Sequence, residues 1–520
     1  MALYTRGRAR RALIDTVSYR AISQVATILG YVVMVRGMTK EDFGVFNLLY
    51  SFIPVISTFA SLGLEQTLRR YQPEYLRAGN RSAAAWLVRF VASARFGTNV
   101  ILLSVILLGW NYAAPVFKLQ PYRAEFAIFC LLVLLYFQAR ILQISLAGNM
   151  LHRYSVGSLA VLSVVKLIAY GLLAWRHAMT VDNVILAETV AFAVAYTFMF
   201  RAYRRHCAGK AAAAGYRPDQ EERRRLLRYG VFNNFNDAGT LMLTSKTDNF
   251  FIAAIIDPVS VGIYSFYTRL NEMARHLLPV NLFENVVQPL FFAVPAAEAD
   301  RKLPLYFSLL VNLNLALQWP ILAFVTAYHT EIVQVVFGGK FVEDSWMLPV
   351  IAGFATLNLV GTPVTLVVQY EEKPGVLLIS KVFGFYNVIA LLALLPIAGV
   401  YGAAIASGTA QAMKNAFIWW HVRHRARWTN AGAALLVSGL LWGAVVMICR
   451  AISVVTGGAP LVNLCIGVVV VALASLIHLR GPAISDGDRS ILAGVLSGRE
   501  AEIFRRLGLL RRKEAVSRDE

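Results

Sequence analysis

Charged side chains are scarce in this chain of 520 residues: only 15% are Asp, Glu, Lys or Arg, whereas 58% are hydrophobic. A soluble chain of this length carries roughly 25% charged residues and folds as several domains. Apolar runs of about 18 residues or more recur from end to end, which is the pattern of membrane-spanning helices. The composition therefore predicts an all-α polytopic membrane protein and excludes a string of soluble domains.

Cysteine and catalytic motifs are also scarce. The four cysteines lie far apart, and none has C-x-x-C spacing or belongs to a Cys/His cluster, so we expect neither a disulfide framework nor a zinc site. The chain has no G-x-x-x-x-G-K-[ST] loop, which excludes ATP hydrolysis by that route. No Ser/His/Asp cluster stands out. We expect no catalytic residue, no metal and no cofactor.

The apolar runs divide into about fourteen predicted spans. Arginines precede the first run and no small-residue cleavage site follows it, so we interpret it as a retained helix rather than a signal peptide. The predicted spans are 14–35, 43–63, 83–110, 124–147, 155–175, 182–201, 229–254, 261–283, 305–327, 345–368, 375–397, 400–420, 432–450 and 459–478.

Positive charge is distributed unequally, and the formal net charge is +20. If the connections alternate sides, the face that holds both termini carries roughly 33 Lys and Arg, and the opposite face about seven. The positive-inside rule then predicts cytoplasmic N and C termini. This orientation explains the basic excess, so we expect no nucleic-acid partner.

The longest polar stretch, residues 202–228, separates two sets of spans. The predicted domains are an N-lobe with helices 1–6, a basic cytoplasmic linker, a C-lobe with helices 7–12, helices 13–14, and a basic cytoplasmic tail. Their ranges are 1–201, 202–228, 229–422, 423–478 and 479–520. Within the tail, residues 490–513 mix apolar and basic positions. Either an amphipathic helix on anionic lipid or a partly disordered tail fits that pattern.

One turn occurs twice. The segments "TKEDFGVFNLLYSF" (39–52) and "DPVSVGIYSFYTRL" (257–270) align Gly44 with Gly262, and an aromatic residue follows two positions later in each. Each segment joins the first span of a half to the second. Glycine there permits a tight turn or a close approach of helices. The recurrence indicates an internal duplication, as in many transporters; chance similarity between two short turns is the alternative.

Four segments together resemble the Wzx-like polysaccharide flippases of the MOP (MATE-like) superfamily: "VRGMTKEDFGVFNLLYSF" (35–52), "GLEQTLRRYQPEYLRAGN" (63–80), "TDNFFIAAIIDPVSVGIYSF" (247–266) and "GVYGAAIASGTAQ" (399–411). Met38 and Lys40 depart from the usual Leu and Pro, which leaves the branch open. The resemblance implies two six-helix lobes related by a pseudo-two-fold axis around a central cavity, plus two C-terminal helices.

The same resemblance implies a role in flipping a polyprenyl-pyrophosphate-linked oligosaccharide across the bacterial cytoplasmic membrane. The product would feed exopolysaccharide or lipopolysaccharide assembly. The expected partners are this lipid-linked glycan and membrane lipids, with polysaccharide polymerase or export machinery as a candidate.

Cations inside predicted spans are functional candidates, because charge in hydrocarbon is costly. An anionic pyrophosphate head group would account for them. Internal pairing is the alternative: Glu272 stands three residues before Arg275 on one helix, whereas Lys166 and Lys246 have no visible local partner. The deep cations expected to bind substrate are Arg95, Arg140, Lys166, Lys246, Arg275 and Lys414.

The seventh predicted span carries a polar stripe with steps of three or four residues, which places its members on one helical face. Such a stripe lines a cavity or forms hydrogen bonds between helices. Two of its carboxylates, Asp237 and Asp248, are candidates for binding a coupling proton or sodium ion. The stripe consists of Asn233, Asp237, Thr240, Thr244 and Asp248.

Several functions compete. A membrane-embedded polysaccharide polymerase or ligase usually needs a large outer loop, and the predicted outer loops are all short. A MATE-type drug/cation antiporter predicts an acidic, aromatic cavity, whereas the deep charge is mainly positive. A lipid II flippase remains a close alternative because its cargo shares the lipid pyrophosphate. A non-transporting scaffold of envelope assembly fits the polar stripe less well. We therefore predict a flippase that works by alternating access through a cationic central cavity.

Overall fold

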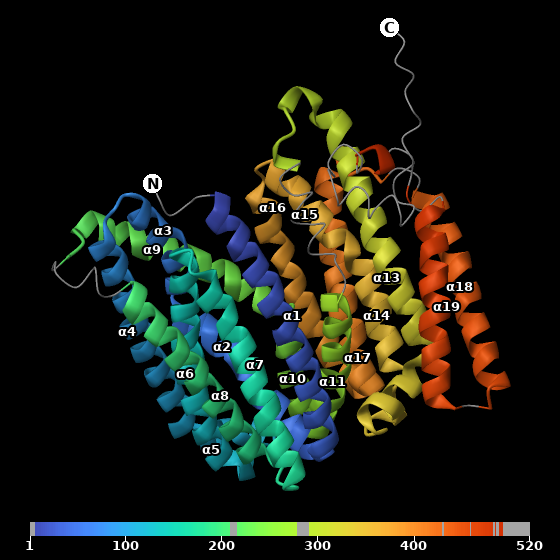
Figure 1. Ribbon diagram of the computed structural model, residues 1–520, viewed down its shortest axis with the longest axis horizontal. Coiled ribbons are helices and arrows are strands. Elements are labelled where there is room, and N and C mark those ends of the chain that lie inside the picture. Colours follow the sequence, from blue (N-terminus) through green and yellow to red (C-terminus); the bar gives the residue numbers. More distant parts are fainter. Residues whose placement is uncertain are drawn as a thin grey trace. The chain divides into compact units, whose positions relative to one another are not determined.

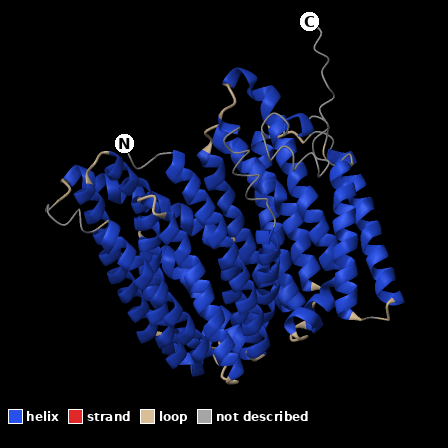
Figure 2. Ribbon diagram, in the orientation of Figure 1, coloured by secondary structure: helices blue, strands red, loops and turns tan. Residues whose placement is uncertain are grey.

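The computed structural model describes residues 6–207, 216–277, 291–428, 431–457, 459–481, 484 and 488–491. All regular secondary structure in these ranges is helical (Figures 1 and 2). The predicted all-α fold class is confirmed. The chain divides into two compact units, 1–265 and 266–520.

Unit 1 is built from long helices with local sequence caps. The Thr39 hydroxyl accepts a hydrogen bond from the Asp42 amide at 3.0 Å, and the Asn80 side chain accepts one from the Ala83 amide at 2.9 Å. Such caps satisfy amides that have no partner inside the helix. The helices are α1 (Arg6–Gly37), α2 (Lys40–Ser61), α3 (Leu64–Arg77), α4 (Arg81–Leu108), α5 (Trp110–Val116), α6 (Arg123–Gly148), α7 (His152–Trp175), α8 (Val181–His206), α9 (Gln220–Leu241), α10 (Ser245–Ile255) and the start of α11 (Pro258–Leu277).

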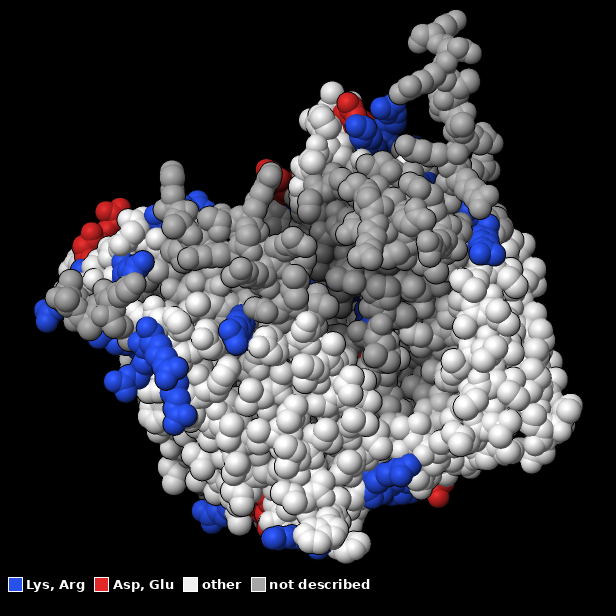
Figure 3. Space-filling model, viewed as in Figure 1, with Lys and Arg blue, Asp and Glu red and all other residues white. Residues whose placement is uncertain are grey.

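Helix packing in unit 1 joins helices that are neighbours in the chain and helices that are distant in it. The most extensive contacts join α1 to α7, α6 to α8, and α7 to α8. Large apolar side chains on the outside of these helices stay exposed, for example Val25, Ile168 and Leu172. On the face seen in Figure 3, wide areas carry no charged side chain. Apolar surface of this kind suits contact with lipid rather than with water.

The described residues of unit 2 form the end of α11 and seven further helices. Short 3₁₀ turns occur in both units, at Gln120–Tyr122, Ala296–Glu298, Val342–Asp344, Asn358–Val360 and Ser380–Val382. The further helices of unit 2 are α13 (Ala299–Phe337), α14 (Met347–Leu357), α15 (Gly361–Tyr370), α16 (Pro374–Ile379), α17 (Phe383–Val422), α18 (Ala431–Val455) and α19 (Pro460–Arg480).

The long helix α17 consists of two antiparallel arms. Its Gly399 has φ 54° and ψ −140°, which is not helical. Asn387 and Ser407 form a hydrogen bond of 3.3 Å across the reversal, and Tyr386 and Thr409 form another of 3.3 Å. A residue with a side chain rarely adopts a positive φ, so glycine suits this position. The predicted break between spans 375–397 and 400–420 is confirmed.

Eleven helical stretches of the described residues are long and apolar enough to cross a membrane. One of them, Pro374–Val422, contains the two arms of α17 and so supplies two of the predicted spans. The seventh predicted span overlaps the two helices α9 and α10, and the eighth overlaps α11. This arrangement is consistent with the expected count of fourteen, and the chain is a multi-pass membrane protein.

Two predicted features of the domain plan fall partly outside the described residues. In the predicted linker, α8 continues to His206 and α9 already begins at Gln220, while residues 208–215 are not described. In the predicted amphipathic segment 490–513, only residues 490–491 are described. The domain boundaries stay predictions.

Candidate functional site

A buried carboxylate, Glu188 on α8, is the centre of the first charged cluster in unit 1. Glu188 is only 4% exposed. The hydroxyls of Tyr50 on α2 and Tyr170 on α7 both donate hydrogen bonds to its carboxylate. The ammonium group of Lys166, also on α7, forms an ion pair with the same carboxylate and lies 4.8 Å from the centre of the Phe192 ring.

This geometry corrects one expectation. Lys166 has a partner, although none is visible on its own helix. The partner comes from the neighbouring helix α8, and contacts between helices cannot be found from spacing along one helix. Breaking a buried pair by removing one partner costs about 3–5 kcal/mol, because it leaves an uncompensated charge.

A second carboxylate, Glu65 on α3, brings together two of the predicted cations. The Arg140 Nε on α6 lies 2.7 Å from Glu65 Oε2, and the Arg95 Nη2 on α4 lies 3.8 Å from Glu65 Oε1. The Arg95 side chain is fully buried. It donates hydrogen bonds to the Ser57 carbonyl at 3.2 Å and to the Ser57 hydroxyl at 3.3 Å, and it lies 4.1 Å from the centre of the Phe137 ring.

Three aromatic rings connect the two clusters. Tyr136 on α6 lies 5.1 Å from Phe137 and 5.4 Å from Phe192, measured between ring centres. Phe137 contacts Arg95 and Phe192 contacts Lys166, each through the ring face. Cation–π contacts stabilise such cations most where water is excluded. The two carboxylates therefore belong to one layer of charge and aromatic rings inside unit 1.

The predicted polar stripe does not lie on one continuous helix. Helix α9 ends at Leu241, and Thr244 is the N-cap of α10, with φ −103° and ψ 146°. The Thr244 and Thr247 hydroxyls both donate to the Leu241 carbonyl at 2.7 Å. These side-chain bonds compete with the helical bonds of the backbone, which is why Thr and Ser favour helix ends. The expectation of a single helix over 229–254 is wrong.

The stripe residues consequently have different surroundings. The backbone positions of Asn233 and Asp237 belong to α9, but their side chains lie outside the described part of the structure. Thr240 is exposed. Asp248 is fully buried, and its carboxylate accepts a hydrogen bond of 2.7 Å from the Tyr264 hydroxyl.

Next to Asp248, the Asn249 amide donates to the hydroxyls of Ser51 at 2.8 Å and Ser265 at 2.9 Å. Asn249 and Ser265 belong to the second half of the predicted duplication, whereas Ser51 belongs to the first. These bonds hold α10 and the start of α11 to α2 within unit 1.

The two glycines of the repeated turn contact each other. A Cβ atom added to Gly44 would lie 2.0 Å from the Pro258 carbonyl oxygen, and one added to Gly262 would lie 3.1 Å from the Gly44 Cα. The first distance is shorter than a Cβ atom allows, and the second is tighter than most Cβ contacts. Of the two roles expected for glycine here, the structure shows the close approach of helices.

The remaining predicted cations lie on α10, α11 and α17. Lys246 on α10 is half-buried. Arg275 on α11 is exposed, and the neighbouring Glu272 pairs with Arg269 at 3.0 Å. Lys414 on α17 is half-buried. Within the described residues, no carboxylate forms an ion pair with Arg275 or Lys414. Glu272 is the local partner considered for Arg275, but in the structure it pairs with Arg269.

At the end of unit 1 that carries the basic loops, α3 contacts the start of α9. The Tyr75 hydroxyl donates to Glu222 Oε1 at 2.5 Å, and the Tyr216 hydroxyl donates to the other oxygen of Glu222. Burial and the hydrogen bond to this carboxylate raise the pKa of Tyr75, and raise the pKa of Tyr216 to about 12. The end of the predicted linker is therefore attached to the first half by polar contacts.

Sequence reasoning missed the two acidic centres, Glu65 and Glu188. Glu188 lies inside the predicted span 182–201, so the rule that selected the cations applied to it as well. Glu65 lies two residues beyond a predicted span and gave no comparable signal. The tyrosines that bind Glu188 look like ordinary apolar-face residues in sequence.

Comparison with known proteins gives a consistent result. The family model described as "Polysaccharide biosynthesis protein" matches residues 13–293, more than half of the chain. No curated protein matches the sequence. Among solved structures, the chain is similar to "Lipid II flippase MurJ, inward closed conformation", with a TM-score of 0.65 and 12% identity over 90% of this chain and 99% of that one.

A second solved structure is an inward-facing multidrug resistance MATE family transporter of the MOP superfamily. Its TM-score is 0.61, with 13% identity over 79% of this chain and 98% of that one. At such identities the likeness shows the fold. The fold is thus the one that these flippase and transporter structures share, and the chain belongs to the polysaccharide biosynthesis protein family.

Proposed function

We propose that this protein is a flippase that moves a polyprenyl-pyrophosphate-linked oligosaccharide across the bacterial cytoplasmic membrane, for exopolysaccharide or lipopolysaccharide assembly. The observation that carries the proposal is the family match over residues 13–293. The transporter fold supports it, because the repeat halves of such folds can alternate between two openings around one binding site. In this proposal both termini are cytoplasmic, and no catalytic residue takes part.

The ion pairs divide the candidate cations into two groups. Arg95, Arg140 and Lys166 are held by Glu65 and Glu188, so we assign them a structural role within unit 1. Arg275 and Lys414 have no carboxylate partner among the described residues. A pyrophosphate group needs cations that are free to donate charge-assisted hydrogen bonds. We therefore assign head-group binding to Arg275 and Lys414. Lys246 stays a candidate on the sequence argument alone.

The polar residues of α9 and α10 are separate cargo-binding candidates, all within unit 1. Asn233, Thr240 and Thr244 offer neutral hydrogen-bonding groups that suit a sugar. Asp237 and Asp248 are the proposed coupling carboxylates for a proton or sodium ion. A polysaccharide polymerase or export machine that receives the delivered glycan is the proposed partner.

A drug/cation antiporter is the second candidate, because Glu188 with Tyr50, Tyr170 and Phe192 forms an acidic, aromatic site. Lys166 already neutralises this carboxylate, which argues against its use for a cationic drug. The likeness to a lipid II flippase structure keeps that cargo as a related alternative. All three functions differ in the cargo they deliver.

The test uses a strain that lacks this protein and any redundant transporter. The wild type, the variant Arg275→Gln/Lys414→Gln and the control Arg269→Gln are each returned to the strain. Arg269 lies on the same helix as Arg275 but is paired with Glu272. A membrane-impermeant probe then measures which leaflet holds the lipid-linked glycan.

We expect the glycan to stay in the inner leaflet in the empty strain and in the double variant, and to reach the outer leaflet with wild type and control. Trapping in the empty strain alone would retain the flippase and reject these two cations. Normal delivery in the empty strain would overturn the proposed function. Trapping of lipid II instead would transfer the function to that cargo.

A further inference from the structure

Two neighbouring grooves run along the outside of unit 1, between α7 and its neighbours α1 and α8. The first has a volume of about 640 Å³ and is lined by α7 and α8. The second, of about 450 Å³, is lined mainly by α1 and α7. They share three residues, Tyr154, Val161 and Phe198. The two grooves therefore lie side by side and are separated by one wall.

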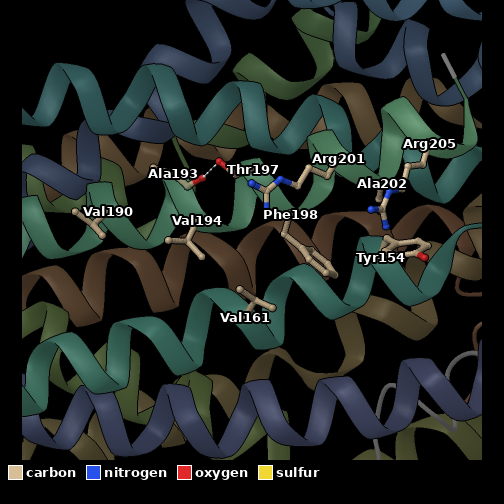
Figure 4. Close-up of a pocket in the computed structure, with 10 residues that line it drawn as sticks. All are labelled: Tyr154, Val161, Val190, Ala193, Val194, Thr197, Phe198, Arg201, Ala202 and Arg205. Atoms are coloured by element: carbon tan, nitrogen blue, oxygen red, sulfur yellow. Dashed lines mark hydrogen bonds between the residues drawn. The ribbon is translucent and has the colours of Figure 1, made fainter. Parts of the chain in front are cut away.

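The walls of the grooves are apolar over most of their length. Val190, Val194 and Phe198 project along α8 into the first groove (Figure 4), and Val190 and Val194 remain 50% and 41% exposed. On the stretch of α8 between Val190 and Phe198, the one polar side chain that lines this groove is Thr197, and its hydroxyl donates a hydrogen bond to the Ala193 carbonyl of the same helix at 2.8 Å. In a membrane protein, such an exposed apolar channel meets acyl chains.

One end of both grooves is cationic. Arg201 and Arg205 stand one turn apart on α8, and the side chain of Arg205 extends toward Tyr154 (Figure 4). Arg153 on α7 lines the same end of the second groove. All three arginines are exposed. In the described part of the chain no acidic residue lines either groove, and none forms an ion pair with these arginines.

The dimensions fit one leaflet. From Val190 to Arg201 is eleven residues, which corresponds to about 16 Å along a helix. Half of a hydrocarbon core is about 15 Å thick. The arginines therefore lie at head-group depth when the apolar grooves lie in the acyl region of the same leaflet. By the basic-loop rule, this is the cytoplasmic leaflet.

We propose that this surface is a binding site for an anionic phospholipid of the cytoplasmic leaflet. Its two acyl chains occupy the two grooves, and its phosphate binds Arg153, Arg201 and Arg205. Charge complementarity and the pairing of two grooves with one cationic end select a two-chain lipid with an anionic head. The site contains none of the proposed cargo cations and does not depend on the proposed function.

The test measures lipid binding to the purified full-length protein by native mass spectrometry. Phosphatidylglycerol and phosphatidylcholine are titrated onto the wild type, onto Arg201→Gln/Arg205→Gln, and onto the control Arg81→Gln/Arg204→Gln. Arg81 and Arg204 are also exposed at the basic end but do not line either groove. A basic residue near an anionic surface contributes about fivefold in affinity, so the groove variant should lose roughly 25-fold of its preference for phosphatidylglycerol.

The groove variant should lose this preference while the control keeps it. If both variants lose the preference for phosphatidylglycerol equally, the effect comes from general surface charge and the proposed site is overturned. If neither variant loses the preference, the site is also overturned. Displacement of the lipid by millimolar inorganic phosphate would assign the arginines to a free anion instead. If a polyprenyl phosphate binds as tightly as phosphatidylglycerol, the proposed two-chain phospholipid is overturned as the ligand in favour of a polyprenyl lipid. If the double variant is not monodisperse, Arg201→Gln against Arg204→Gln gives the same comparison.

Discussion

Replacing Glu65 with alanine is expected to destabilise unit 1 strongly, because it leaves the buried Arg95 without a counter-charge. The Arg95 side chain is 0% exposed, and Glu65 is the carboxylate that pairs with it. After the change, the Ser57 oxygens and the Phe137 ring remain as the partners of Arg95 among the described residues. An uncompensated buried charge of this kind costs about 3–5 kcal/mol.

Arg140→Gln provides the contrast within the same cluster. The Arg140 side chain is 41% exposed, so water screens its pair with Glu65 in spite of the 2.7 Å distance. Its loss should cost about 0–1 kcal/mol. The variant Glu65→Leu/Arg95→Met removes both buried charges at similar volume, and should recover most of the stability lost in Glu65→Ala.

The assay is the free energy of unfolding in mixed detergent micelles, measured for all four proteins under one set of conditions. The expected order of stability is wild type, then Arg140→Gln, with Glu65→Ala last and the double variant close to wild type. If Glu65→Ala is no less stable than Arg140→Gln, or if the double variant is as unstable as Glu65→Ala, the buried-charge argument is refuted.

Three further predictions use the same unfolding assay. Glu188→Gln should cost about 3 kcal/mol or more, because it leaves Lys166 without its counter-charge; an unchanged free energy would show that the pair is solvated. Gly44→Ala should cost about 1–3 kcal/mol through overpacking against the Pro258 carbonyl. The control Gly97→Ala, with open space around it in α4, should be neutral or stabilising. Equal effects of the two substitutions would contradict the close approach of the helices at Gly44. Gly399→Ala should cost about 1–3 kcal/mol from backbone strain at positive φ, although nothing lies within 4 Å of the position of the added Cβ. The control Gly353→Ala also has open space around it and should not lose this stability. An unchanged stability of Gly399→Ala would mean that the chain reversal adapts to the side chain.

Several elements follow from local sequence. The break at Gly399 is visible as a glycine between two apolar runs, and the start of α2 follows from Thr39 before an acidic first turn. Glycine freedom and helix capping act over a few residues, so sequence shows them directly. The break between α9 and α10 had a similar signal in Thr244 and Ser245. Hydropathy alone did not reveal this break, because the polar residues of 229–254 also fit one face of a single helix.

The ion pairs could not be predicted in the same way. Glu188 binds groups from α2 and α7, and Glu65 binds groups from α4 and α6. Each pair depends on which helices are neighbours and on how each is rotated about its axis. Neither property follows from hydropathy or from spacing within one span.

The sequence by itself determined the class of protein: long apolar runs and uneven basic loops indicate a helical membrane protein, since a helix of about 20 apolar residues spans the hydrocarbon and pairs its backbone groups within itself. Tertiary structure alone decided which deep cations are neutralised. Arg95, Arg140 and Lys166 look equivalent to Arg275 and Lys414 in sequence, yet only the first three meet a carboxylate among the described residues. The reason is that the cost of a buried charge depends on its partner, and the partner comes from another helix.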